Sequence, residues 1–147
     1  MIYTKLTRKA MRLAFDVHKE QVDKTGLPYI FHPFHLAEQM TTEDEVIVAL
    51  LHDVVEDSDI TPEDLRAQGF PENVVDAVSL LTRDDSVKCE YEDYIAAIKT
   101  NPLAAKVKLA DLIHNSDETR LDEIDDKMKK LHDKYRTAIN LLKADGK

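Results

Sequence analysis

Apolar residues recur along most of this chain at the three- and four-residue spacing that is typical of amphipathic helices. The first such segment places one apolar face over Leu6, Ala10, Leu13, Ala14 and Val17. A later segment begins after Thr42, a residue suited to cap a helix, and three acidic residues fill its first turn. Its core-facing stripe comprises Ile47, Leu50, Leu51, Val54 and Val55. The spacing therefore predicts one helix that carries all five of these residues.

Turn and cap residues divide the rest of the chain into further helices. Gly26 and Pro28 break the chain after the first helix and predict a loop over residues 24–28. Pro33 is tolerated in the first turn of a short helix over 32–40. The remaining predicted helices are a small one opened by residues 61–64 and ended by Gly69, then 71–82, 91–99, one capped by Asn101 with Pro102 at its first position, and a last one carrying Met128, Leu131, Tyr135, Ala138 and Leu142. The sequence thus predicts an all-α fold of seven or eight helices with no convincing strand.

Length and composition favour a single domain over residues 1–147. The chain has 147 residues, 43% of them hydrophobic, and only 3 glycines, which argues against a turn-rich β fold. Its one cysteine, Cys89, excludes an internal disulfide and a cysteine-based zinc site, so we expect a reducing, cytoplasmic location. No segment approaches the roughly 20 apolar residues of a membrane span, and we expect no membrane association.

The charge distribution argues against a nucleic-acid partner and for a metal. The net charge is −9, whereas phosphate backbones require basic patches, although a small anionic substrate beside a metal remains compatible. Residues 25–65 contain ten acidic residues and no Lys or Arg. Within them His52 and Glu56, and likewise Asp53 and Asp57, are four residues apart, so on a helix they share one face. Crowded carboxylates need a cation, which predicts a metal site; the alternative is a solvated acidic face with a surface histidine.

Two further residues are unusual for their surroundings. Asp111 lies between apolar neighbours in a predicted helix, so a buried carboxylate there needs a partner. It could serve a metal, or it could cap a neighbouring helix or pair with a lysine. His32 opens the short helix at residue 32, and taken singly it fits a structural histidine as well as a ligand.

In combination these features resemble the HD-domain metal phosphohydrolases, in which a lone His precedes a His-Asp pair and a distant Asp. Within that superfamily the chain looks like the hydrolase domain of the Rel/Spo alarmone enzymes and the stand-alone small alarmone hydrolases. The resemblance extends from about Leu6 to Tyr135. It rests on three stretches in order: "KTGLPYIFHPFHLA", "ALLHDVVEDSD" and "NPLAAKVKLADLIHN".

The resemblance implies a compact HD-domain helical bundle that hydrolyses the 3′-pyrophosphate of ppGpp or pppGpp and yields GDP or GTP and pyrophosphate. It implies one Mn²⁺, with Fe²⁺ or another divalent metal as an alternative, and the mixed nitrogen and oxygen donors suit such ions. The implied metal ligands are His32, His52, Asp53 and Asp111. The implied catalytic pair is Glu56 and Asp57, which would orient or deprotonate the attacking water.

The implied substrate contacts follow the family less closely. Lys24, Asn115 and Tyr135 match residues that contact the nucleotide in the family, and Tyr135 also fits ordinary core packing. The sequence departs from the family at Asp23, where a basic residue is usual, and at Leu112 and Asp117, where arginines are usual. Arg120 follows shortly after and is a candidate replacement. The remaining histidines are expected in the core or behind the ligands: His18, His35 and His114.

Three interpretations therefore stay open. The first is a metal-dependent alarmone hydrolase acting on a small nucleotide. The second is an HD-domain phosphohydrolase for another nucleotide or phosphoester, which the three departures favour. The third is a metal-stabilised helical module that binds a nucleotide or a protein partner without turnover. The sequence sets no oligomeric state.

Overall fold

The structure is a computed structural model, which describes residues 1–83 and 90–144; Cys89 lies outside these ranges. In the described residues the chain forms eight α-helices and one short 3₁₀ helix, with no strand and one isolated β-bridge. The predicted all-α fold is confirmed. In chain order the elements are α1 (Lys5–His18), α2 (Phe31–Glu38), α3 (Glu43–Leu51), α4 (Pro62–Ala67), α5 (Glu72–Leu81), α6 (Tyr91–Lys99), α7 (Pro102–Asn115), η1 (Glu118–Arg120) and α8 (Asp126–Lys143).

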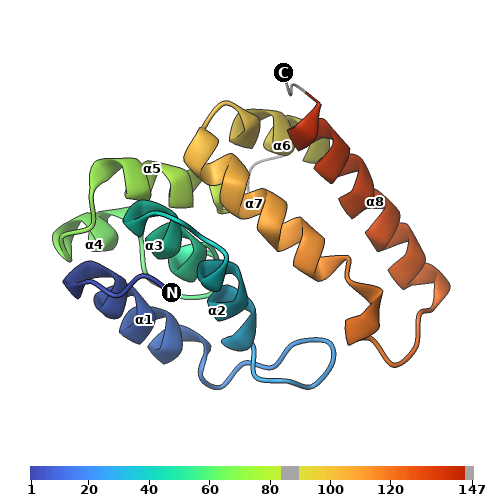
Figure 1. Cartoon of the computed structure of the whole chain (residues 1–147), viewed down its shortest axis with the longest axis horizontal. Coiled ribbons are helices and arrows are strands. Elements are labelled where there is room, and N and C mark those ends of the chain that lie inside the picture. Colours follow the sequence, from blue (N-terminus) through green and yellow to red (C-terminus); the bar gives the residue numbers. More distant parts are fainter. Residues whose placement is uncertain (84–89, 145–147) are drawn as a thin grey trace.

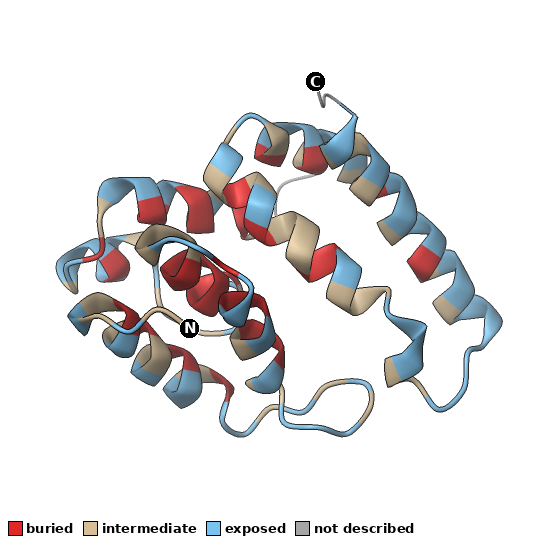
Figure 2. Cartoon of the chain, in the orientation of Figure 1, coloured by how far each residue is buried: buried red, intermediate tan, exposed pale blue. Residues whose placement is uncertain are grey.

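Helix α3 forms the centre of the molecule. All six residues from Val46 to Leu51 are fully buried, so the helix is covered on every side rather than along one stripe. Helices α1, α2, α5 and α7 pack against it (Figure 1). Figure 2 shows the buried positions gathered on α3 and on the sides of its neighbours that face it. The core therefore holds the short segment that follows α3 in a fixed place.

Side-chain caps set the helix starts that the sequence predicts. Thr42 accepts a hydrogen bond from the backbone N–H of Glu45, and Asn101 accepts one from Ala104. Thr61 forms a reciprocal capping box at the start of α4. Gly69 follows α4 with a φ of 96°, a left-handed conformation that glycine adopts without steric strain. These helix boundaries are confirmed.

The predicted extent of the third helix is wrong at its C-terminal end. Helix α3 stops at Leu51, and the chain continues through a series of turns to residue 59. The backbone N–H of Val54 donates to Leu51 over 3.0 Å, a tighter i to i−3 bond, whereas Asp57 donates to Asp53 over 2.9 Å. The four-residue spacings from His52 and Asp53 therefore fall in turns and not on one regular helix face.

Helices α6, α7 and α8 form a second group beside the α3 core. α8 packs on α6 and α7, and α7 also contacts α3, α2 and α5 (Figure 1). The loop between α1 and α2 contains the predicted break, and Gly26 adopts a φ of 85° there. Within residues 1–83 and 90–144 no helix combines the length and the apolar character needed to cross a membrane.

Candidate metal centre and adjoining cavities

Four side chains with metal-binding atoms meet where α2, α7 and the turn after α3 come together. His32 lies in the first turn of α2, His52 and Asp53 directly follow α3, and Asp111 lies in α7. Ligand atoms of His32, His52 and Asp53 all lie within 4.8 Å of one another. Asp111 Oδ1 lies 2.8 Å from Nε2 of His32 and 3.6 Å from Nε2 of His52. The structure thus brings together the four residues that the sequence singled out as ligands.

The hydrogen bonding of His52 indicates a cation beside it. Its Nδ1 lies 2.7 Å from the carbonyl oxygen of Ala49, which can only accept, so Nδ1 carries the proton. When the ring is neutral, the other nitrogen, Nε2, carries no proton and presents a lone pair. This atom is buried and has no hydrogen-bond partner among the described residues. It lies 3.1 Å from Oδ2 of Asp53, and lone pairs that converge in this way require a positive charge between them.

The electrostatics of this group favour a cation as well. Burial opposes a charge on His52, yet the carboxylates of Asp53 and Asp111 hold its pKa well above the usual value of 6.5. The field that attracts a proton to the imidazole also attracts a metal ion. Two imidazoles and two carboxylates form a donor set that suits Mn²⁺ or Fe²⁺, so the residues fit a divalent transition metal.

Asp111 is held by neighbours on its own helix. Lys108 Nζ donates to Oδ2 over 2.9 Å, and the Asn115 amide donates to Oδ1 over 3.1 Å. Burial opposes its ionisation, but the charge on Lys108, the hydrogen bond from His32 and the nearby imidazole of His52 hold the pKa of Asp111 well below its usual range. Asp111 is therefore an oriented carboxylate. The lysine partner that the sequence left as an alternative is present beside the metal-type donors.

Tyr29 holds the other carboxylate. Its hydroxyl donates a short hydrogen bond to Oδ2 of Asp53. Burial works against the charge on Asp53, yet the imidazole of His52 and this hydroxyl bring its pKa down to about 2. Burial and the negative charge of Asp53 raise the pKa of Tyr29, so the phenol keeps its proton and remains a donor.

His114 contacts His32 at Nδ1, the ring nitrogen that does not face Asp111. The Nδ1 atoms of the two rings lie 2.7 Å apart, so one of them donates and the other accepts. The rings stack with their centroids 5.0 Å apart, and the His35 ring lies 4.2 Å from that of His114. Burial and the nearby Arg120 lower the pKa of His114 to about 4, so its ring is neutral at pH 7. His114 thus lies against a metal-type residue as expected, whereas His35 is exposed and contacts the ring of His114.

Glu56 and Asp57 point toward different neighbours. Glu56 accepts a hydrogen bond of 2.8 Å from the backbone N–H of Arg83. Asp57 accepts one of 3.2 Å from the Gln21 side chain, and Gln21 in turn lies 2.8 Å from Nδ1 of the buried His18. Glu56 lines a cavity together with His52 and Asp53, whereas Asp57 belongs to a hydrogen-bonded chain that leads to α1.

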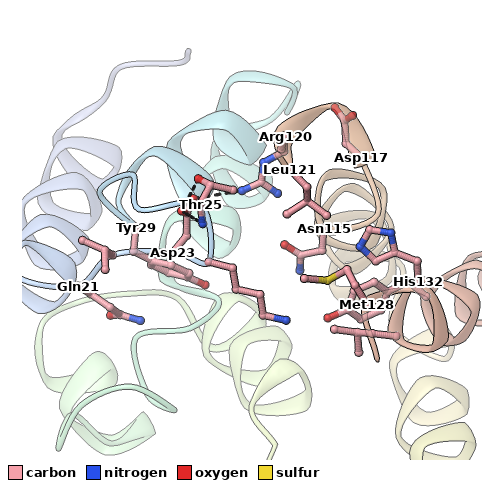
Figure 3. A pocket seen from close by; sticks show the side chains of 14 residues that line it. Gln21, Asp23, Thr25, Tyr29, Asn115, Asp117, Arg120, Leu121, Met128 and His132 are labelled. Carbon is pink, nitrogen blue, oxygen red and sulfur yellow. Dashed lines mark hydrogen bonds and ion pairs between the residues drawn. The ribbon is translucent and has the colours of Figure 1, made fainter. Parts of the chain in front are cut away.

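Two cavities lie near the metal-type residues; the first is lined by none of the four, and the second is lined by His52 and Asp53. The first, of about 300 Å³, is called the Thr25 cavity here, and Figure 3 shows its walls coming from the loop after α1 on one side and from the α7–α8 side on the other. It contains Lys24, Asn115 and Tyr135, the three predicted substrate contacts. The second, of about 180 Å³, is called the Tyr94 cavity. Asn115, Leu131 and Tyr135 line both cavities, so the two meet at these residues.

A family model described as "HD domain" matches residues 10–115 of the chain, which include all four metal-type residues. The chain belongs to the HD-domain family. Two curated relatives show what this HD domain is similar to. The guanosine-3′,5′-bis(diphosphate) 3′-pyrophosphohydrolase of Aquifex aeolicus is 35% identical over 118 residues, which is 74% of this chain and 17% of the relative. The bifunctional (p)ppGpp synthase/hydrolase SpoT of Escherichia coli K12 is 32% identical over 124 residues, 76% of this chain and 18% of the relative.

The HD domain therefore spans less than a fifth of the length of these curated relatives. A solved structure, described as a metazoan ortholog of SpoT that hydrolyses ppGpp, is matched over a larger share of both chains than these relatives are. It matches with a TM-score of 0.79 and 22% identity over 97% of this chain and 87% of its own. At that identity the likeness shows the shared helical fold.

Several residues of this HD domain were not singled out from the sequence. Lys108 lies three residues before Asp111 on α7, a spacing that would have found it, whereas Tyr29 reaches Asp53 across 24 positions of the sequence. The acidic stretch over residues 25–65 has no basic residue of its own, but the fold brings Lys106 to Glu45 over 2.9 Å. Arg83 approaches Glu56 across 27 positions of the sequence, a contact that no local spacing signals.

Proposed function

We propose that this HD domain is a metal-dependent phosphohydrolase that removes the 3′-pyrophosphate from ppGpp or pppGpp. The observation that carries the proposal is the lone pair of His52 Nε2, buried among the donors of His32, Asp53 and Asp111. The similarity to 3′-pyrophosphohydrolases supports the choice of substrate. Residues 1–147 would act as one domain, in the cytoplasm, where such a nucleotide is found.

The proposed metal is Mn²⁺, with Fe²⁺ or another divalent ion as an alternative, held by His32, His52, Asp53 and Asp111. When bound, the ion supplies Lewis acidity and neutralises charge on the reacting phosphate. Asn115 and Lys108 keep the Asp111 carboxylate in place, and Tyr29 does the same for Asp53. These hydrogen bonds hold the donor set in one arrangement before substrate arrives.

Glu56 is the proposed general base. It lines the Tyr94 cavity with His52 and Asp53. Burial and the nearby Asp53 and Asp57 carboxylates raise its pKa above that of a free glutamate, although the backbone N–H of Arg83 opposes the shift. A carboxylate of raised pKa accepts a proton from water more readily. Water attacks the phosphorus next to the ribose, the bond to the 3′ oxygen breaks, and GDP or GTP leaves together with pyrophosphate.

Asp57 is proposed to assist at the same water, positioned by Gln21. Lys24, Asn115 and Tyr135 are proposed to bind the nucleoside part of the substrate in the Thr25 cavity. This cavity combines polar side chains with the apolar groups of Leu121, Met128 and Leu131, and its volume lies at the lower end of the range for small-molecule sites.

The direct test is formation of GDP and pyrophosphate from ppGpp by the purified chain, with Mn²⁺ and with EDTA. Asp53→Asn keeps the shape of the side chain and removes its charge, and we expect it to reduce turnover by at least about a hundredfold. The matched control is Asp59→Asn, an exposed position of the same turn region. Turnover that survives both EDTA and Asp53→Asn would contradict the proposal.

A second candidate substrate class follows from Asp23. Its carboxylate lies 3.3 Å from Arg120 Nη2, so the loop position that is basic in the alarmone hydrolases is acidic here and binds the neighbouring arginine (Figure 3). An acidic residue paired with an arginine presents a different surface to a guanine base than a basic residue does, which favours another phosphorylated nucleotide or phosphoester. A panel of nucleotides in which only ppGpp and pppGpp are hydrolysed would remove this alternative.

A further inference from the structure

His18 is a buried histidine that the metal centre and the two cavities do not use. It is the last residue of α1, its side chain is fully buried, and it lines neither the Thr25 cavity nor the Tyr94 cavity. Its Nδ1 lies 2.8 Å from Oε1 of Gln21, whereas its Nε2 is buried without a hydrogen-bond partner among the described residues. A buried nitrogen without a partner opposes folding. The contact that Nδ1 makes therefore explains this histidine better than stability does.

The hydrogen bonds that begin at His18 run in one direction, toward Asp57. Gln21 Nε2 lies 3.2 Å from Oδ2 of Asp57, and a carboxylate oxygen only accepts, so Gln21 presents its NH₂ group there. The carbonyl oxygen of the same amide then faces His18, so Nδ1 of His18 carries the proton and donates. His18 Nδ1 and Asp57 Oδ2 are 3.9 Å apart, too far for a direct hydrogen bond. The side chains of His18, Gln21 and Asp57 thus form a hydrogen-bonded series, called the His18 chain here.

The bond from Gln21 decides where the Asp57 carboxylate points. Within residues 1–83 and 90–144 it is the only hydrogen bond that this side chain makes. The backbone of Asp57 is fixed separately, because its N–H donates to the carbonyl oxygen of Asp53 over 2.9 Å. The Asp57 side chain is 27% exposed, so without Gln21 its carboxylate would turn freely toward water.

His18 in turn restricts the Gln21 amide. The Gln21 backbone is held on both sides, since its N–H donates to His18 over 2.9 Å and its carbonyl oxygen accepts from Tyr29 over 2.8 Å. Figure 3 shows Gln21 and Tyr29 on the wall of the Thr25 cavity that the loop after α1 forms. The amide could still turn by half a rotation, which would bring its carbonyl oxygen against the Asp57 carboxylate. The Nδ1–H group of His18 opposes that rotation, because it needs the carbonyl oxygen as its acceptor.

We propose that His18 is a positioning residue for the hydrolytic reaction, and that through Gln21 it holds the Asp57 carboxylate toward the attacking water. The proposal rests on the role of Asp57 in the proposed function. A carboxylate that is oriented before the substrate arrives needs no reorganisation during the reaction. The C-terminal end of α1, which supplies none of the four metal-type residues, thereby contributes to the chemistry.

Two substitutions at His18 separate its hydrogen bond from its shape. His18→Phe keeps a ring against Tyr29, whose ring centroid lies 4.9 Å away, and removes the Nδ1–H donor. His18→Asn removes the ring but places an amide NH₂ at the position of Nδ1. For ppGpp with Mn²⁺ we expect His18→Phe to lower kcat by about tenfold or more and to leave KM within about twofold, and His18→Asn to retain more of the wild-type kcat. A histidine that only packs would give the opposite order of the two variants, and that order would overturn the proposal.

Gln21→Met breaks the His18 chain at its middle and keeps the length of the side chain. We expect kcat to fall as in His18→Phe, and the double variant to be little worse than either single one, because both break the same series of bonds. Effects that multiply would contradict the chain. The matched control is Gln39→Met, an exposed residue that bonds only the backbone of α2, and it should keep the wild-type kcat.

Affinity for Mn²⁺, measured by competition with a chelator, distinguishes the His18 chain from the metal centre. His18→Phe keeps the ring contact with Tyr29, so we expect it to bind Mn²⁺ as the wild-type protein does. A loss of Mn²⁺ affinity as large as the loss of kcat would assign His18 to the metal centre and overturn the proposal.

NMR of the full chain, with diamagnetic Mg²⁺ in place of Mn²⁺, tests the His18 chain without turnover. The imidazole nitrogen shifts should place the proton of His18 on Nδ1, and the Gln21 side-chain amide signal should move in both His18→Phe and Asp57→Asn. A proton on Nε2 in the wild-type protein would overturn the proposal. Circular dichroism verifies the fold of each variant, and if His18→Phe does not fold, Gln21→Met and the wild-type spectra decide the question.

The outcomes separate the His18 chain from the proposed function. If the protein fails to hydrolyse ppGpp but the spectra place the proton on Nδ1 and connect His18 with Asp57, the function is wrong and the orientation of Asp57 by His18 stands. If the protein hydrolyses ppGpp while His18→Phe and Gln21→Met keep the wild-type kcat, the positioning role is wrong and the function stands.

Discussion

At the scale of single residues, Asp23 organises the loop that borders the Thr25 cavity. Its Oδ1 accepts hydrogen bonds from the backbone N–H and the hydroxyl of Thr25, over 2.8 and 2.6 Å, and from the backbone N–H of Leu27 over 3.1 Å. Its Oδ2 pairs with Arg120. The residue that departs from the alarmone hydrolases thus has a structural role in this chain.

We predict that Asp23→Asn lowers the free energy of unfolding by about 1 kcal/mol at pH 7. Burial opposes the charge on Asp23, but the bonds from Thr25 and Leu27 and the charge of Arg120 together lower its pKa below 3.8. A lowered folded pKa stabilises the protein above the unfolded value, and this contribution is lost as the pH falls through the folded pKa. Urea unfolding at pH 7 and pH 3 should show the wild-type advantage shrinking, and a constant difference would contradict the assignment.

Tyr29 offers a second prediction at this scale. Tyr29→Phe removes the hydroxyl that donates to Asp53 and leaves the ring. We expect the affinity for Mn²⁺ to fall by about tenfold or more, because partners of metal ligands commonly contribute this much. Competition with a chelator measures the affinity, and Tyr3→Phe, at an exposed ring, serves as the control. Equal affinities in the two variants would remove Tyr29 from the metal centre.

At the scale of elements, α3 contributes stability through burial on all sides. Leu50 is fully buried at its centre. Leu50→Ala should lower the free energy of unfolding by about 2–5 kcal/mol, the usual cost of such a cavity. Urea denaturation measures it, with the exposed Leu27→Ala as the control, for which we expect a change within about 0.5 kcal/mol. A small effect at Leu50 would mean that the core relaxes around the missing side chain.

The helix starts could be read from the sequence because their causes are local. Thr42, Thr61 and Asn101 each bond a backbone N–H three residues ahead, and that chemistry is visible in the order of residues. The end of α3 could not be read in the same way. The apolar spacing continues to Val55, and it suits a helix or a series of turns equally. Packing against other segments decides between them, and the sequence alone does not show that packing.

At the scale of the whole molecule, the metal-type residues join separate parts of the fold. His32 comes from α2, Asp111 from α7, and His52 and Asp53 from the segment after α3. The sequence predicted this set because the three stretches match one family in order. It could not predict the gathering of Arg83 and Lys134, since these residues lie on separate elements and only the tertiary arrangement brings them into one cavity.

A bound ion that links these segments should stabilise the folded chain. At an ion concentration a hundred times the Kd, binding to the folded state alone adds about 2.7 kcal/mol. We therefore predict that Mn²⁺ raises the Tm of the wild-type protein and that EDTA reverses the rise. His32→Ala should abolish the Mn²⁺ effect, whereas His35→Ala should retain most of it. A Tm that does not respond to Mn²⁺ in the wild-type protein would argue against the metal centre.

The placement of α8 has a consequence for how this chain can change over evolutionary time. The helix packs on α6 and α7 and contributes Leu131, Lys134 and Tyr135 to the cavities, while the metal-type residues lie on other segments. Substitutions on α8 can therefore reshape the wall that meets a ligand without disturbing the metal-type donors. Related proteins could therefore acquire new substrates through substitutions on this one helix, while the metal-type residues stay the same.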